Sequence, residues 1–246
     1  MPRVSLSVLV TVVSYMAVER RWASDLRKQH NEVAGFIYAI LGLVYGVLIA
    51  YVVVVVWQNF HTAQLTTQLE ANAVADLYAL AEDLPAGAGV LLKDLARAYA
   101  QSVVEDEWPL LGHGEASPRS TALASSLGRA VRALDPQNAR EQLIVEHAVV
   151  VHQSLLDNRR LRLFQSRTGI QPILWIILIS GGILTVAFAY LFGVSSTRSH
   201  ALMVAALAAT IAGILYMIEA TDYAYSGDIR VPPTPFEQVL ATIGGP

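Results

Sequence analysis

The sequence contains no cysteine and has few charged residues for its length. Only 15% of its 246 residues are Asp, Glu, Lys or Arg, whereas 54% are hydrophobic. The absence of cysteine excludes disulfides, thiolate metal ligands and cysteine nucleophiles. An ordinary soluble domain carries roughly a quarter charged residues, so this chain has too few to coat a water-soluble particle of its size. The composition therefore indicates an integral membrane protein.

The sequence also lacks the motifs of common enzymes. It has no G-x-S-x-G, no H-E-x-x-H and no phosphate-cradling glycine loop. The histidines are scattered, and the spacing of His147 and His152 does not put two ligands on one helical face. The net charge of −3 gives no nucleic-acid footprint, which would require a clustered basic face. We therefore expect no enzyme, no cofactor, no metal site and no nucleic-acid partner.

What the sequence does contain is long uncharged stretches. Three of them have no charged residue: Phe36–Trp57, Ile173–Val194 and Ala201–Ile218. About 20 helical residues cross a hydrocarbon core of roughly 30 Å, so the first two are long enough and the third is near the lower limit. Val52–Val56 is expected to be helical, because an isolated strand would leave its backbone polar groups unpaired in lipid.

A fourth apolar segment, Val4–Val18, suits either a short spanning helix or the core of a secretory signal. The small-residue cleavage pattern fails, because Ala17 would need a small partner at the position of Tyr15. Three hydroxyl residues on one face of the segment are suited to hydrogen bonding with neighbouring helices: Ser7, Thr11 and Ser14. We therefore predict a retained fourth span.

These segments predict an all-α, polytopic membrane protein with four transmembrane helices. Residues 1–57 would form a first transmembrane hairpin, and 172–218 a second one. Residues 58–171 between them are an amphipathic helical extramembrane region, and 219–246 form a polar C-terminal tail.

Apolar stripes predict the inner faces of the helices between the spans. One stripe continues from the second span and consists of Leu65, Leu69, Ala73, Leu77, Leu80 and Leu84. The other leads towards the third span and consists of Leu143, His147, Val150 or Val151, Leu155, Leu161 and Phe164. Ser117-Pro118 and Asp135-Pro136 predict helix starts. The acidic run Glu105-Asp106-Glu107 is predicted to be solvated surface.

Small residues form stripes on two of the spans. They are Gly35, Gly42 and Gly46 on the second span, and Ala205, Ala209 and Gly213 on the fourth. In lipid, helices associate through close backbone approach, which small residues permit. The stripes fit packing inside one four-helix bundle or packing between subunits, and spacing does not separate these alternatives.

Four polar residues border the spans. Asn31 and Glu32 precede the second span, and Glu219 and Asp222 follow the fourth. Charged groups beside hydrocarbon often mark ion paths, which makes these residues candidates for an ion-interacting pore mouth. Helix ends also normally carry such residues at the wet interface. With four spans, the two pairs lie on opposite membrane faces.

His30–Phe36 runs straight into the apolar segment that contains Gly42 and Tyr45. This arrangement resembles the bacterial bestrophin-like domain family, a family of unknown function distantly related to the bestrophin anion channels. Further matches are Glu70-Ala71-Asn72-Ala73, Asp76-Leu77-Tyr78, Glu107-Trp108-Pro109, Leu191-Phe192-Gly193 and Gly227–Val231. The resemblance covers about Asn31 to Val239. It implies two spans, a cytoplasmic helical insert and two further spans, in a pentamer whose second span lines a narrow neck.

The expected function is a homo-oligomeric ion channel of a bacterial inner membrane, with inorganic ions and membrane lipid as partners. Anion conduction and a pentamer are implied by the resemblance. The candidate pore-lining or gating residues are Tyr45, Ile49, Val52 and Val56. Apolar Val52 and Val56 would form a constriction that closes by dewetting, with Tyr45 as a polar handle. The alternative is a non-conducting membrane sensor or scaffold that acts through its helical region.

The sequence departs from the bestrophin pattern in two respects. Val52–Val56 stands where aromatic side chains are expected, and no acidic clasp for calcium is present. Charge and resemblance also disagree about orientation. Arg20, Arg21, Arg27 and Lys28 crowd the first short loop, which favours a cytoplasmic loop and an external helical region. The resemblance places that region in the cytoplasm.

Overall fold

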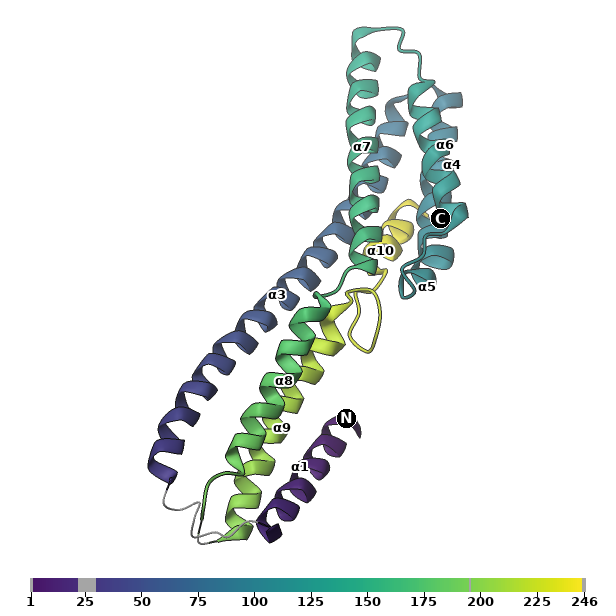
Figure 1. The fold of residues 1–246 in the computed structure, drawn as a ribbon. Coiled ribbons are helices and arrows are strands. Elements are labelled where there is room, and N and C mark those ends of the chain that lie inside the picture. The colour runs from purple at the N-terminus through teal and green to yellow at the C-terminus, as the bar shows by residue number, and fades with distance from the viewer. Residues whose placement is uncertain (1, 22–29, 195, 245–246) are drawn as a thin grey trace. The chain divides into compact units, whose positions relative to one another are not determined.

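The structure, a computed structural model, describes residues 2–21, 30–194 and 196–244. Arg27 and Lys28 of the basic loop lie outside the described residues. All regular elements in the described ranges are helical (Figure 1), as predicted: α1 (Pro2–Arg21), α3 (Asn31–Leu80), the 3-10 turn η1 (Ala81–Asp83), α4 (Ala86–Ser102), the π-helical segment η2 (Val103–Glu107), α5 (Trp108–Leu111), α6 (Pro118–Arg132), α7 (Ala139–Arg167), α8 (Pro172–Ala189), α9 (Thr197–Asp222) and α10 (Thr234–Ile243).

The chain forms two compact units. The membrane unit comprises residues 1–57 and 170–222, and the insert unit comprises residues 58–169 and 223–246. Helix α3 contributes its first half to the membrane unit and its second half to the insert unit. The C-terminal residues, predicted to be a polar tail, include α10, whose apolar side chains join the core of the insert unit.

Three helices of the described chain are long and apolar enough to cross a membrane, namely α3, α8 and α9. The apolar part of α1, Ser7–Ala17, is shorter. Val52–Val56 lies within α3 and is helical, as predicted. The long helix of the insert does not run on into the next span, because α7 ends at Arg167 and α8 begins at Pro172. A proline at this position favours a new helix start, since the residue before it is held in an extended conformation.

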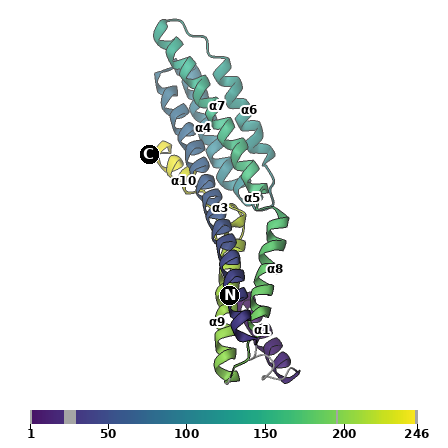
Figure 2. The same ribbon diagram turned by 60° about the vertical axis from the view of Figure 1, so that its left-hand side comes forward.

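In the membrane unit, α1 and α8 both pack along α9 (Figures 1 and 2). A glycine pair on α8 also permits close contact with α3. A Cβ added to Gly181 would lie 2.7 Å from the Tyr45 ring, and one added to Gly182 would lie 2.9 Å from the Tyr45 hydroxyl. Contacts of this length do not occur between real side chains, so only glycine fits where Tyr45 lies against α8.

Replacing Gly181 by alanine is therefore expected to destabilise the membrane unit. Overpacking at a closely packed contact costs about 1–3 kcal/mol. The matched control is Gly213→Ala, because a Cβ at that position meets no atom within 4 Å. Thermal unfolding in detergent should show a lower midpoint for Gly181→Ala and no loss for the control. Equal midpoints would contradict this account of the α3–α8 contact.

The insert unit buries its core between the second half of α3 and helices α4, α6, α7 and α10 (Figure 2). Most of the fully buried positions of α3 recur at i, i+4 and i+7, which is the spacing of one helical face: Ala63, Thr67, Glu70, Val74 and Leu77, with Ala71 beside them. The predicted inner stripe is therefore wrong at its start, since Leu65 and Leu69 are exposed. The face that is buried carries a charged residue in its middle.

Helix α7 has two apolar faces rather than one. Val151 and Leu155 belong to the core, together with Ala148. Four other large apolar residues of α7 are exposed: Leu143, Val150, Leu161 and Phe164. The prediction that Leu143, Leu161 and Phe164 face inward is therefore wrong. Of the alternatives Val150 and Val151, it is Val151 that is buried. With about 100° between successive residues, the four exposed residues form an apolar stripe on one side of α7, interrupted between Val150 and Leu161 by the exposed Ser154 and Asp157. The four side chains are not covered by any other part of the described chain.

Two helix starts of the insert were predicted from the sequence. Ser117 caps α6, since its side-chain oxygen accepts a hydrogen bond from the Ser120 backbone N–H at 3.3 Å. That prediction is confirmed. The second is wrong in position, because α7 is capped by Asn138, which accepts from the Glu141 N–H at 2.9 Å. Asp135-Pro136 lies in the preceding connection.

Helices α6 and α7 approach closely at Gly128. A Cβ on Gly128 would lie 2.6 Å from the His152 ring, so glycine makes room for the imidazole. His152 is buried, and its Nε2 lies 3.3 Å from the Ala124 carbonyl oxygen. Burial lowers the pKa of His152 below its ordinary value of 6.5, and the nearby Arg132 guanidinium lowers it further.

This depressed pKa makes stability depend on pH. Below about pH 6.5 the unfolded chain binds a proton at His152 more readily than the folded chain does, so the free energy of unfolding falls as the pH is lowered. Denaturant unfolding between about pH 7 and pH 5 should show a smaller loss of stability for His152→Gln than for the wild-type chain. An identical pH dependence of the two would show that His152 does not titrate differently on folding.

Candidate functional site

The candidate pore residues lie on one face of α3, inside the membrane unit. Tyr45, Ile49, Val52 and Val56 are buried and pack against apolar residues of α8 and α9. The Tyr45 hydroxyl donates a hydrogen bond to the Leu178 carbonyl oxygen of α8 at 2.9 Å. A pore between copies of the chain would be lined by side chains that a single chain leaves exposed. In the single chain, these four residues instead hold α3 against its neighbours.

The opposite face of α3 is apolar and open. Val47, Tyr51 and Val54 are 64%, 64% and 51% exposed. With about 100° per residue, they lie across the helix from the buried face. Gly42 and Gly46 lie on the side of α3 between the buried face and this open face, and a Cβ added at either would meet no atom within 4 Å. The close approach that these two glycines permit is therefore not used within the described chain.

The remaining small-residue positions are less uniform. Gly35, Ala205 and Ala209 are partly buried. Gly213 is as open as Gly42, with nothing within 4 Å of an added Cβ. The glycines that bring spans together are Gly181 and Gly182 of α8, small residues that interrupt the third uncharged run.

Two of the four boundary residues tie segments of the membrane unit together. The Asn31 side chain donates to the Gly193 carbonyl oxygen at 2.7 Å and accepts from the Gly193 N–H at 3.0 Å. Asp222 is buried and accepts from the Ile170 N–H at 2.7 Å and from the Trp175 ring at 3.2 Å. These bonds fasten the ends of α3 and α9 to segments next to α8 or within it.

The other two boundary residues, Glu32 and Glu219, are exposed. They are therefore the boundary carboxylates that water can reach in the single chain. Among the described residues, no three His, Asp or Glu side chains gather in a group that would hold a metal ion.

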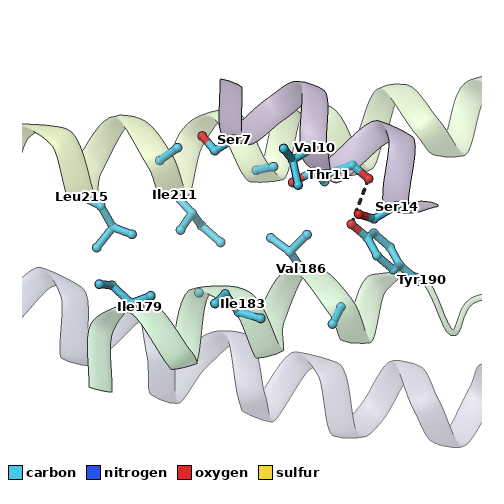
Figure 3. Close-up of a pocket in the computed structure, with 14 residues that line it drawn as sticks. Ser7, Val10, Thr11, Ser14, Ile179, Ile183, Val186, Tyr190, Ile211 and Leu215 are labelled. Carbon is cyan, nitrogen blue, oxygen red and sulfur yellow. Dashed lines mark hydrogen bonds between the residues drawn. The ribbon is translucent and has the colours of Figure 1, made fainter. Parts of the chain in front are cut away.

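A cavity of about 340 Å³ lies between α1, α8 and α9 (Figure 3). The hydroxyl residues of α1 line it together with apolar side chains of the other two helices, among them Ile183 and Ile211. The hydrogen bond that joins α1 to α8 here runs from the Tyr190 hydroxyl to the Thr11 backbone carbonyl oxygen at 3.0 Å. The α1 residues Ser7, Thr11 and Ser14 thus face a mainly apolar cavity.

The insert unit contains a buried ionic cluster centred on Arg162. This side chain is fully buried, and so are Glu70 and Glu107. Arg162 donates to the two oxygens of Glu70 at 2.7 and 2.9 Å and to Glu107 at 2.7 Å. Its guanidinium carbon also lies 5.4 Å from the centre of the Trp108 ring. Bidentate guanidinium–carboxylate pairs of this kind are among the strongest hydrogen-bonded contacts in proteins.

The outer members of the cluster satisfy the remaining carboxylate oxygens. Glu107 accepts from Arg159 at 2.6 Å and from the Ser117 backbone N–H at 3.0 Å. Glu70 accepts from the Tyr99 hydroxyl at 2.6 Å. We call these five ionic and hydroxyl side chains, Glu70, Tyr99, Glu107, Arg159 and Arg162, the Arg162 cluster. Two carboxylates face two guanidinium groups, so the formal charges balance.

The electrostatics of the cluster keep Arg162 and Tyr99 in their hydrogen-bonding forms. Burial alone would lower the pKa of Arg162, but the Glu70 carboxylate outweighs it and raises the pKa well above its ordinary value. Burial raises the pKa of Tyr99 well above its ordinary value, and the Glu70 carboxylate raises it further. Arg162 therefore stays charged and Tyr99 stays a donor across the physiological pH range.

This cluster was not predicted from the sequence. Glu105-Asp106-Glu107 was expected to be solvated, which is wrong for Glu107 because its side chain is buried. The π-helical segment η2 explains the difference, because it widens the helix by one residue per turn where Glu107 turns inward. A signal was present: Glu70 and Glu107 each belong to a segment that carries the family resemblance.

The chain matches the family model of the Bestrophin-like domain over residues 5–236. The chain belongs to the bestrophin-like family. The resemblance noted in the sequence is thereby confirmed, and the chain is a membrane protein of that family. A search of curated proteins finds no match.

Solved structures of bacterial bestrophin homologues from Klebsiella pneumoniae share the fold of this family member. A mutant of one such homologue superposes with a TM-score of 0.75 at 12% identity, covering 99% of this chain and 100% of its own. Another structure of a homologue from that organism gives 0.71 at 13% identity, covering 99% and 98%. The fold is therefore bestrophin-like over nearly the whole length of the chain.

Because of the Arg162 cluster, we expect two neighbouring carboxylates to contribute very differently to the stability of the insert unit. Glu107→Gln leaves Arg162 and Arg159 with too little negative charge, and breaking a buried ion pair costs about 3–5 kcal/mol. The matched control is Glu105→Gln, an exposed position two residues away, which should change stability by less than about 0.5 kcal/mol. Denaturant unfolding of the full chain in detergent measures both. Similar losses in the two variants would show that the cluster does not stabilise the insert unit.

Proposed function

We propose that copies of this chain form a homo-oligomeric ion channel of the bestrophin-like type in a bacterial inner membrane, with α3 lining the pore. The chain would cross the membrane four times, with α1 as the shortest span. The observation that carries the proposal is the apolar face of α3 that includes Val47, Tyr51 and Val54, which stays open in a chain of this family. Anions are the proposed cargo, and five copies the proposed assembly, by relation to the bestrophin channels.

The pore would be lined by the open face of α3, while its buried face sets the position of the helix. Val47 and Val54 lie two turns apart on that open face, where they would form an apolar constriction that conducts only when wetted. Tyr51 adds a hydroxyl between them. Tyr45, Ile49, Val52 and Val56 retain the proposed gating role, because any rotation of α3 has to rearrange their contacts with α8 and α9.

Adjacent copies would meet beside this pore at the flank of α3 that carries Gly42 and Gly46. Small residues let helix backbones approach closely, which is the main source of attraction between helices in lipid. The space next to both glycines is open in the single chain. Glu32 and Glu219, which are exposed at the ends of the spans, are the proposed ion-interacting residues of the pore mouths.

The test is ion flux through the purified protein in liposomes. Val54→Ser should raise anion flux severalfold, because a hydroxyl stabilises water in an apolar constriction. The control is Ile176→Ser, an exposed apolar position on α8, which should leave flux at the wild-type level. Reversal potentials in a salt gradient then report whether anions or cations carry the current.

Two results would count against the channel. Absence of flux for wild type and for Val54→Ser, at several voltages and pH values, would favour a non-conducting sensor or scaffold. A monomer in detergent and in lipid would remove the basis for a pore between copies. Equal effects of Val54→Ser and Ile176→Ser would contradict the assignment of the lining face.

A further inference from the structure

A polar cleft of about 460 Å³ lies between α6 and α7 of the insert unit. We call it the α6–α7 cleft. A second hollow of about 430 Å³ adjoins it and shares Arg132, His152 and Arg160 with it. These volumes fall within the range of small-molecule sites, which is about 300–1,000 Å³.

The cleft follows from the spacing of residues on the two helices. On α6, Thr121, Gly128 and Arg132 recur at i, i+7 and i+11, so they share the face that looks towards α7. On α7, His152 and Arg159 recur at i and i+7. Gly128 supplies the floor, since any side chain there would collide with the His152 ring.

The lining of the cleft is rich in arginine, although the chain as a whole is slightly acidic. Arginine side chains reach it from both helices: Arg129 and Arg132 from α6, and Arg159 and Arg160 from α7. Arg160 is paired with Asp157 at 2.9 Å, on the exposed rim. Within the described part of the chain, neither Arg129 nor Arg132 forms an ion pair. The basic residues gather only on folding, which is why the sequence showed no basic face.

Arg159 is the buried wall of the cleft. It is only 8% exposed, and its Nη2 donates to Glu107 at 2.6 Å and to the Thr121 hydroxyl at 2.9 Å. Its Nε–H is buried and has no hydrogen-bond partner in the described chain. The cleft is therefore lined by a guanidinium that is held in place by Glu107 and Thr121 rather than by a mobile surface side chain.

We propose that the α6–α7 cleft binds a small phosphate-bearing anion. Guanidinium forks match the geometry of phosphate oxygens, and they dominate the polar lining of this cleft. The concave shape and the buried Arg159 favour a small ligand over a flat protein partner. The phosphate could belong to a free anion or to the headgroup of an anionic lipid. The site does not depend on whether the chain conducts ions.

The experiment is calorimetric titration of the full chain in neutral detergent with inorganic pyrophosphate. The wild-type chain should bind it, and Arg132→Gln should weaken binding by about tenfold or more, as expected for loss of one charge-assisted contact. Arg119→Gln is the matched control. It removes an exposed arginine of the same helix that lies outside the cleft and pairs with Asp106, and it should change the affinity by less than about twofold.

A second arm separates the two sources of phosphate. The same titration is repeated in lipid vesicles of phosphatidylcholine, with and without phosphatidic acid. Loss of pyrophosphate binding only in the presence of phosphatidic acid identifies the lipid headgroup as the occupant, and unchanged binding identifies a free anion.

Three outcomes would overturn the proposal. The first is no binding of pyrophosphate at millimolar concentration by a folded wild-type chain. The second is equal weakening by Arg132→Gln and Arg119→Gln, which would reflect general charge attraction. The third is a change in subunit number on Arg132→Gln without any pyrophosphate binding, which would show that acidic residues of a second copy fill the cleft.

Discussion

Arg162 is a cation without access to water, and the insert unit is arranged around the two carboxylates that neutralise it. Glu70 comes from α3, Glu107 from η2, and Arg162 from α7. None of the three is tolerable in an apolar core without the others, since an uncompensated buried charge costs several kcal/mol. Leucine and alanine contacts would permit a helix to slip by a turn at modest cost, whereas forked hydrogen bonds do not. We therefore infer that this cluster sets the register of α3 against α7.

Helix α3 is held a second time within the membrane unit. There the Tyr45 hydroxyl bonds to the Leu178 carbonyl oxygen, and the Tyr45 ring lies against the glycine pair of α8. Both contacts depend on a buried polar group, and burying such a group is costly unless its hydrogen-bond partner is in place. Each of these contacts fixes, within its own unit, the face that α3 turns towards its neighbours.

The sequence predicted the elements of this structure better than their faces. Uncharged runs identify spans because lipid excludes charge, and this rule placed α3, α8 and α9 correctly. Faces were predicted from apolar periodicity, which fails where a helix buries charges on one side and carries apolar residues on the other. Leu65 and Phe164 are exposed, while Glu70 and Arg162 are buried. Which face of such a helix is buried depends on ion pairs between residues far apart in the sequence. The local spacing of apolar residues does not reveal these pairs.

The exposed apolar stripe of α7 bears on how many copies of the chain are needed. Leu143, Val150, Leu161 and Phe164 belong to the insert unit, whose helices also carry exposed charges such as Arg160 and Asp157. A surface with that many charges is not suited to acyl chains, so lipid is a poor cover for the stripe. Large apolar side chains that gather on one side of a helix at a wet surface favour burial against protein. A second copy of the same chain would supply that cover in the proposed homo-oligomer, for which the open face of α3 is the main argument.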